Sequence, residues 1–178
     1  VLFCLVDSSI PGRNDGFIED TSIEWLDIQI QRAGPDVPVF VAFHHPPVIL
    51  HMAFMDTIRQ TGEERLVDLA RDADVLALQE TKCTDAQFPV APFEAAGYEV
   101  AHVGVNQWNG VAVVSRVGLD DVATSFPGQP AWAAKPEAEP VVEARALGAT
   151  VGAASDATPV RLWSLYVPNG RELTHPHY

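Results

Sequence analysis

Cysteine and basic residues are both scarce in this sequence, and each scarcity excludes a class of protein. The 178 residues include only two cysteines, Cys4 and Cys83, which are too few and too far apart for a disulfide framework or a cysteine zinc cluster. Eleven lysines and arginines stand against twenty-four aspartates and glutamates, a net charge of −13, so bulk charge does not indicate a nucleic-acid binder. Any contact with nucleic acid must then depend on a metal ion and on local geometry.

Long uninterrupted apolar segments are also missing. The most apolar stretch, residues 37–55, is broken by histidines and prolines, so it cannot span a bilayer, and no signal peptide is visible. We therefore expect a cytoplasmic protein without a membrane partner. Hydrophobic residues make up 47% of the chain, which is ample for a buried core. Both ends of the chain are interpreted as cut, because Val1 opens inside an apolar run and no terminating element precedes Tyr178.

The order of apolar runs predicts an α/β fold. Continuous apolar runs predict strands at residues 1–6, 37–43, 74–78, 98–104, 110–115, 141–149 and 160–167. Helical patterns predict helices near residues 20–32, 61–71 and 85–96. The alternation of strands and helices in the first part favours parallel pairing, whereas the short spacing of strands from Tyr98 onward favours antiparallel pairing. Residues 126–140 are predicted to be a surface loop, and the whole is predicted to be a layered α/β sandwich.

Two polar residues lie at the ends of predicted strands. Glu80 closely follows the strand at 74–78, and Tyr166 lies at the end of the strand at 160–167. Ligands collect at the carboxyl ends of strands in open α/β sheets. A single carboxylate there is more typical of a helix cap or a solvated loop than of a ligand, and such a tyrosine is more typical of a half-buried core side chain. Taken one at a time, these residues leave both interpretations open.

Short motifs spread over residues 73–178 favour the functional interpretation. They are Leu78-Gln79-Glu80-Thr81-Lys82, Phe88-Pro89, Gly97-Tyr98, Trp108-Asn109-Gly110-Val111-Ala112, Phe126-Pro127-Gly128, Glu143-Ala144-Arg145 and Tyr166-Val167-Pro168-Asn169-Gly170. In this order and spacing, the segment resembles the exonuclease III family of DNA-repair nucleases. The resemblance implies the layered α/β sandwich of endonuclease, exonuclease and phosphatase domains. It also implies hydrolysis of DNA at 3′ ends or abasic sites, with DNA as the partner.

The resemblance further implies roles for individual residues. Glu80 matches the family's metal-binding glutamate, which holds Mg²⁺ or Mn²⁺, and a hard carboxylate suits that ion. Tyr166 matches the active-site tyrosine beside the phosphate. Asn169 matches a polar side chain that contacts the DNA backbone, and Asn109 matches a substrate-facing strand start. Arg145 is expected to belong to a structural ion pair or hydrogen-bond network.

Several residues that the family needs for its chemistry do not appear in the segment. The family has an asparagine on its first strand and, further downstream, an Asp/Asn pair, another aspartate and a closing Asp-His pair, and none is found as part of this motif set. The general base and several transition-state donors are therefore missing. We expect the chain to bind Mg²⁺ weakly through Glu80 and to show little or no nuclease activity alone.

A second set of motifs lies in residues 1–72. It contains Asp7-Ser8-Ser9-Ile10-Pro11-Gly12 and, after an apolar strand, His44-His45-Pro46-Pro47. These motifs resemble calcineurin-like metallophosphoesterases of the cyclic-nucleotide phosphodiesterase type. In that family the first histidine of a His-x-Pro after an apolar strand coordinates one ion of a two-metal centre, and here that position is His44. The resemblance implies a second divalent metal ion at His44, although the other ligands of that centre are absent from the sequence.

The two resemblances meet near residue 72 and leave three functions open. The sequence predicts a chimera of a partial metallophosphoesterase segment, residues 1–72, and a partial exonuclease III-like segment, residues 73–178. The first function is a Mg²⁺-dependent hydrolase acting on DNA. The second is a non-catalytic chimeric fragment, and the third is a cyclic-nucleotide phosphodiesterase. The sequence does not indicate an oligomeric state.

Overall fold

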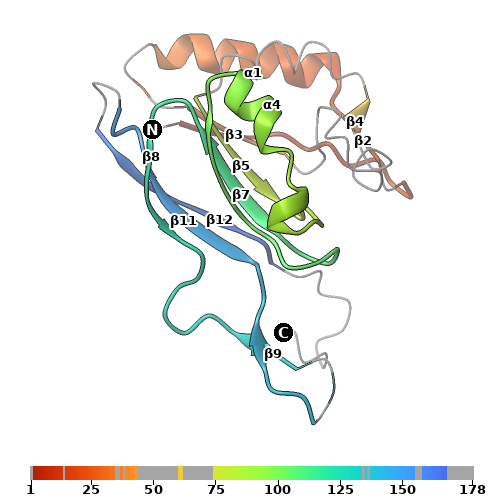
Figure 1. The fold of residues 1–178 in the computed structure, drawn as a ribbon. Helices are drawn as coiled ribbons and strands as arrows, with labels where there is room; N and C mark the ends of the chain where they lie inside the picture. The colour runs from red at the N-terminus through yellow and green to blue at the C-terminus, as the bar shows by residue number, and fades with distance from the viewer. Residues whose placement is uncertain are drawn as a thin grey trace. The chain divides into compact units, whose positions relative to one another are not determined.

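The structure, a computed structural model, divides the chain into two compact units. They comprise residues 1–73 and residues 74–178, and each is described by itself (Figure 1). The described residues are 2–13, 15–34, 37, 39–43, 60–61, 74–133, 135, 137–154 and 158–167. Within them, no helix is long and apolar enough to cross a membrane.

Among its described residues, the first unit contains two short parallel strand pairs and one long helix. β1 (Leu2–Leu5) pairs in parallel with β3 (Val39–Ala42), and α1 (Asp20–Ala33), the long orange helix of Figure 1, connects them in the chain. β2 (Gly16–Phe17) pairs in parallel with β4 (Gln60–Thr61). The parallel pairing expected for this part of the chain is therefore confirmed.

A small apolar core holds α1 against β1 in this unit. Its buried members are Cys4, Val6, Ile18, Ile23 and Leu26. The two helical members are three residues apart and so share one helix face. Their burial explains why the apolar pattern of this segment predicted the helix correctly.

The second unit opens with a three-stranded antiparallel sheet. Its order is β5 (Val75–Gln79), β7 (Val111–Ser115) and β6 (Glu99–Val103), with β7 in the centre and buried along its whole length. β5 pairs antiparallel with β7. The expectation that residues 74–78 continue a parallel region was therefore wrong. The neighbour of β5 is β7, which runs in the opposite direction.

A second antiparallel sheet packs against the first. Its order is β12 (Val160–Leu165), β11 (Ala146–Val151) and β8 (Leu119–Ala123). One apolar cluster joins the two central strands, β7 and β11, through Val111, Val113, Leu147, Ala149 and Val151. The second unit is therefore a sandwich of two sheets whose core lies between β7 and β11.

The segment 85–96 differs from the single helix that was predicted. A short 3-10 helix, η1 (Asp85–Gln87), is followed by the α-helix α4 (Val90–Ala95). Pro89 lies between the two, and proline cannot donate the backbone hydrogen bond that a continuous helix needs. The connection between β5 and β6 is consequently a bent helical segment (Figure 1).

Other element boundaries also differ from expectation. The strand predicted at 141–149 is two strands, β10 (Val141–Val142) and β11, and β10 pairs with β9 (Ala131–Trp132) inside the predicted loop 126–140. β8 was not predicted, because Asp120 and Asp121 break its apolar run. The helix expected near 61–71 lies outside the described residues, apart from Thr61, which belongs to β4.

Candidate functional site

Strand ends of both sheets meet at one end of the sandwich in the second unit. Gln79, the last residue of β5, pairs with Val111, the first residue of β7. The side-chain amide of Gln79 donates a hydrogen bond across to the second sheet, at 3.0 Å from Ser164 Oγ on β12, and Ser164 Oγ donates back to Leu78 O at 2.9 Å. The residues that follow β5 and β12 are thereby held at the same end. Glu80 and Tyr166, both expected at strand ends, follow strands of two different packed sheets.

The Glu80 loop, residues 80–82, has an unusual backbone conformation. Glu80 and Lys82 have φ angles of 54° and 51°, in the left-handed region that non-glycine residues rarely adopt. Thr81, between them, is only 2% exposed. Its N–H donates to Gly110 O at 3.2 Å, and the Lys82 N–H donates to Asn109 O at 2.9 Å. The Lys82 ammonium also lies 3.8 Å from Glu80 Oε1. The loop is therefore tied to the strand start at 109–110.

Tyr166 reaches Glu80 from the second sheet. Burial raises the pKa of Tyr166, a hydrogen bond with Glu80 and the charge of that carboxylate raise it further, and Arg145 acts in the opposite direction. The Arg145 guanidinium carbon lies 4.5 Å from the centre of the Tyr166 ring, and the Tyr166 N–H donates to Arg145 O at 2.8 Å. The phenol is thus held between a carboxylate and a guanidinium.

A cluster that we call the Glu143 network, consisting of Asn109, Gln129, Glu143 and Arg145, supports this arrangement. Glu143 accepts hydrogen bonds from Asn109 Nδ2 at 3.3 Å and Arg145 Nε at 2.7 Å, and its backbone carbonyl accepts one from Gln129 Nε2 at 2.9 Å. The ion pair expected for Arg145 is confirmed. Three buried atoms of the network, Asn109 Oδ1, Gln129 Oε1 and Arg145 Nη1, have no hydrogen-bond partner in the described part of the chain.

Asn109 occupies a different environment from the one that its predicted role suggests. Its side chain is 1% exposed and its amide donates to Glu143. In this structure the residue supports the loop and the Glu143 network from inside. Direct contact with substrate stays a prediction.

A second cluster, the His102 network of Thr81, Asp85 and His102, lies on the other side of the Glu80 loop. His102 Nδ1 lies 2.8 Å from Asp85 Oδ1, and His102 Nε2 lies 2.8 Å from Thr81 Oγ1. Phe88 stacks on the imidazole at 4.3 Å between ring centres. Burial lowers the pKa of His102, although Asp85 acts to raise it. Sequence reasoning missed this network, because a lone histidine in an apolar strand gives no signal of its partners.

The described residues contain no group of three His, Cys, Asp or Glu side chains that could together hold a metal ion. Glu80 is a single half-buried carboxylate at the site. Mg²⁺ is often bound by one or two carboxylates together with waters and substrate phosphates, so Glu80 fits as one such ligand. His44 and Asn169, the other two predicted site residues, lie outside the described residues.

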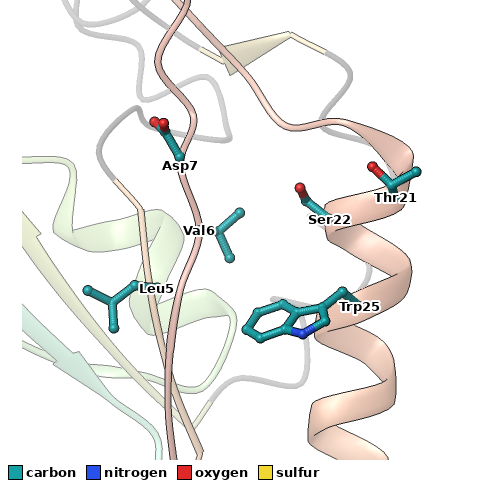
Figure 2. A pocket seen from close by; sticks show the side chains of 6 residues that line it. All are labelled: Leu5, Val6, Asp7, Thr21, Ser22 and Trp25. Carbon is teal, nitrogen blue, oxygen red and sulfur yellow. The ribbon is translucent and has the colours of Figure 1, made fainter.

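The first unit has a separate, shallow pocket of about 320 Å³ between β1 and the start of α1. It is lined by Leu5, Val6, Asp7, Thr21, Ser22 and Trp25. Figure 2 shows the side chains of Val6 and Trp25 directed into the space between strand and helix. Asp7 Oδ1 accepts a hydrogen bond from the Ser9 N–H at 2.8 Å, which is typical of a turn rather than of a ligand site.

The chain belongs to the Endonuclease/Exonuclease/phosphatase family, whose model matches residues 53–177. Members of this family typically depend on a divalent metal ion. The predicted α/β fold of this type is confirmed.

Curated relatives are phosphodiesterases. A probable cyclic nucleotide phosphodiesterase from Rhodococcus erythropolis is 34% identical over 99 residues, covering 52% of this chain and 33% of that protein. A glycerophosphodiester phosphodiesterase from Enterobacter lignolyticus is 41% identical over 64 residues, covering 36% and 23%. The chain therefore spans a third or less of the length of these two relatives. The join between two segments of different descent stays a prediction.

Among solved structures, the chain is similar to a 3′ phosphatase from Neisseria bound to a product DNA hairpin. The two are 31% identical, the match covers 64% of this chain and 39% of that one, and the TM-score is 0.48. An AP endonuclease from Archaeoglobus fulgidus is 25% identical over 63% of this chain and 38% of that one, with a TM-score of 0.46.

Proposed function

We propose that the chain carries the substrate-binding part of a metal-dependent phosphodiester hydrolase of the exonuclease III type, acting on DNA. The observation that carries the proposal is that Glu80 and Tyr166 follow β5 and β12, two strands of packed sheets that the Gln79–Ser164 hydrogen bond joins at one end of the sandwich. The two residues belong to widely separated motifs, and the resemblance to exonuclease III assigns both to the same phosphate. A carboxylate beside a phenol offers a ligand for a cation and a donor for a phosphate oxygen.

Each residue has a specific task in this proposal. Glu80 would hold Mg²⁺ or Mn²⁺, and the bound ion would neutralise charge on the scissile phosphate. Tyr166 carries a hydroxyl that is protonated at neutral pH and can donate to a phosphate oxygen. Arg145 orients the Tyr166 ring, and Glu143 orients Arg145. Asn169 and Asn109 are proposed to contact the DNA.

DNA as the substrate is supported by the order of the exonuclease III motifs and by an exposed aromatic residue at the same end of the sandwich. Trp108, 68% exposed, lies in the loop between β6 and β7, and its backbone N–H donates to Asn106 Oδ1 at 2.9 Å. Nucleobases stack on such exposed aromatic rings. A net charge of −13 opposes long-range attraction of DNA, so recognition would be local.

Two alternatives are each favoured by a specific observation. The absence of a three-ligand metal cluster among the described residues favours a non-catalytic chimeric fragment. The phosphodiesterase relatives and the His44 motif favour a cyclic-nucleotide phosphodiesterase. One experiment with three substrates and the variant Glu80→Gln can separate the proposed function from these two alternatives.

The test measures hydrolysis of abasic-site duplex DNA, cyclic AMP and bis(p-nitrophenyl) phosphate by the purified chain, with Mg²⁺ and with EDTA. Binding of Mn²⁺ is followed in parallel by electron paramagnetic resonance. We expect weak Mn²⁺ binding and slow, Mg²⁺-dependent cleavage of DNA alone, and both should be lost in Glu80→Gln. Because a general base and several donors are missing, the rate should lie on the order of a hundredfold or more below that of a complete site.

Two results would contradict the proposal, and a third would correct one part of it. Hydrolysis of cyclic AMP that survives Glu80→Gln would favour the cyclic-nucleotide phosphodiesterase. Neither Mn²⁺ binding nor turnover on any substrate would favour the non-catalytic fragment. Rapid DNA cleavage abolished by Glu80→Gln would support the substrate and Glu80 but show that the chemistry is less incomplete than we infer.

A further inference from the structure

The His102 network connects three separate elements in one chain of hydrogen bonds. Asp85 opens η1, His102 lies on β6, and Thr81 follows β5. Asp85 Oδ1 also accepts the Gly104 N–H at 2.7 Å, and the Asp85 N–H donates to Gly104 O at 3.1 Å. A carboxylate can only accept, so Nδ1 of His102 carries the proton, and Nε2 of the neutral ring accepts from the Thr81 hydroxyl. With the ring neutral, the hydrogen bonds from Thr81 through His102 to Asp85 all run in one direction.

The order carboxylate, imidazole, hydroxyl is also found in nucleophilic hydrolases, but burial excludes that role here. Thr81 is 2% exposed, and the His102 side chain is 4% exposed. A methyl group added at Gly110 would lie 2.2 Å from Thr81 Oγ1, so the strand start packs directly on the hydroxyl. No substrate has room to reach it. The network must therefore act indirectly, through the Glu80 loop that it fixes.

The network holds a strained loop. Glu80 and Lys82, on either side of Thr81, both have positive φ angles, at 54° and 51°. Such conformations persist in non-glycine residues only where the surroundings impose them. The backbone hydrogen bonds to Asn109 and Gly110 fix one side of the loop, and the Thr81 side chain, bonded to His102, fixes the other.

We propose that Asp85, His102 and Thr81 form a positioning set for Glu80. They orient the carboxylate toward Tyr166 and toward the phosphate site by fixing the left-handed turn that carries it. The consequence for metal binding rests on the proposed function, whereas the consequence for the loop conformation does not. The set acts on the loop and is not proposed to bind substrate or metal, so its members are positioning residues.

One pair of variants at Thr81 tests the central hydrogen bond. Thr81→Val keeps the shape of the side chain and removes the hydroxyl, whereas Thr81→Ser keeps the hydroxyl. With Mn²⁺ as the probe, Thr81→Val should weaken binding by about tenfold, the range seen when groups that orient metal ligands are removed. Thr81→Ser should stay within about twofold of the wild type, because the donor to His102 is retained.

A measurement on the loop itself needs neither metal nor activity. The amides of Thr81 and Lys82 are hydrogen-bonded in the folded protein, and their hydrogen exchange reports on the turn. Thr81→Val should accelerate exchange at both amides, and Thr81→Ser should not. Exchange at Val113, in the centre of β7, should be equal in all three proteins and shows that the fold is intact.

Asp85→Ala provides an independent variant in case Thr81→Val fails to fold. The Asp85 side chain is 66% exposed, so its removal leaves the core untouched. It should release the proton of His102 from Nδ1, which the nitrogen shifts of the imidazole report, and accelerate exchange at Thr81. Asp120→Ala, an exposed aspartate on β8, is the matched control and should change neither quantity.

The outcomes separate this inference from the proposed function. If the wild type binds no Mn²⁺ but Thr81→Val and Asp85→Ala still accelerate exchange in the loop, the proposed function is wrong and the positioning set stands. If the wild type binds Mn²⁺ and both variants leave affinity and exchange unchanged, the positioning set is wrong and the proposed function stands.

Discussion

The two networks beside the Glu80 loop differ in charge and in how completely their groups are paired. The Glu143 network contains an ion pair and leaves Asn109 Oδ1, Gln129 Oε1 and Arg145 Nη1 without partners among the described residues. In the His102 network both ring nitrogens are bonded, and the ring is neutral. The first network therefore contains buried polar atoms that no described residue satisfies, whereas the imidazole of the second is bonded at both nitrogens.

The largest effect should come from a change at Gly110, which follows Asn109 of the Glu143 network and packs on Thr81 of the His102 network. Gly110 has a φ of 114°, and an added methyl group would meet Thr81 Oγ1 at 2.2 Å. Gly110→Ala should lower the free energy of unfolding of the second unit by about 3 kcal/mol or more, through backbone strain and overpacking. Gly128→Ala is the control, since its φ of 80° is also positive but nothing lies within 4 Å. It should cost about 1 kcal/mol in the same urea titration. Equal losses would show that contact with Thr81 is unimportant.

Next in size is the loss of the cation in the Glu143 network. Arg145→Met leaves the Glu143 carboxylate half-buried and unpaired with its cation, and should cost about 3 kcal/mol of stability. The Arg145 and Glu143 side chains are 16% and 19% exposed, so solvent screens their interaction little. Arg13→Met breaks an exposed ion pair with Asp15 and should have little measurable effect. A loss at Arg145 no greater than at Arg13 would mean that the network is a surface feature.

The His102 network should make stability depend on pH in one direction. Burial lowers the pKa of His102 below its usual value of 6.5. Above pH 6.5 the imidazole is mostly unprotonated in both the folded and the unfolded chain. As the pH falls through 6.5, the unfolded chain binds a proton while the folded chain does not yet bind one. Stability should therefore fall with acidification below pH 6.5 and level off once the native ring is also protonated.

The measurement is the urea midpoint between neutral and mildly acidic pH for the wild type and for His102→Gln. The difference between the two isolates His102 from the other titrating groups. The wild type should lose more stability than the variant on acidification. A wild type that gains stability relative to His102→Gln on acidification would mean that Asp85 outweighs burial and that the ring is charged.

The smallest effect on stability is expected outside both networks. Trp108 is largely exposed, so Trp108→Ala should change the free energy of unfolding by no more than about 0.5 kcal/mol. Its effect on DNA should be larger, a loss of about tenfold in affinity for single-stranded DNA in a fluorescence titration, because a stacking surface is removed. Unchanged affinity would place DNA recognition away from this loop.

Several features could be predicted because they depend on residues close together in the chain. The helix at 20–33 follows from the three-residue spacing of Ile23 and Leu26, and strand β7 from an unbroken apolar run. Other features failed for local reasons that the pattern could not reveal. Asp120 and Asp121 interrupt the apolar run of β8, which pairs with β11. The burial of Asn109, expected at a substrate-facing strand start, was not foreseen, and its contact with substrate stays a prediction.

The sequence by itself determined the α/β class, most strands of the second unit and the identity of the motif residues Glu80 and Tyr166, because burial imposes a pattern on neighbouring positions. Only the tertiary structure decided that Tyr166 meets Glu80 from another sheet, that Arg145 lies over its ring, and that His102 joins Asp85 to Thr81. These contacts join residues that are far apart in the chain. Their geometry depends on strand register, on the packing of two sheets and on side-chain direction, none of which the spacing of residues along a chain can specify.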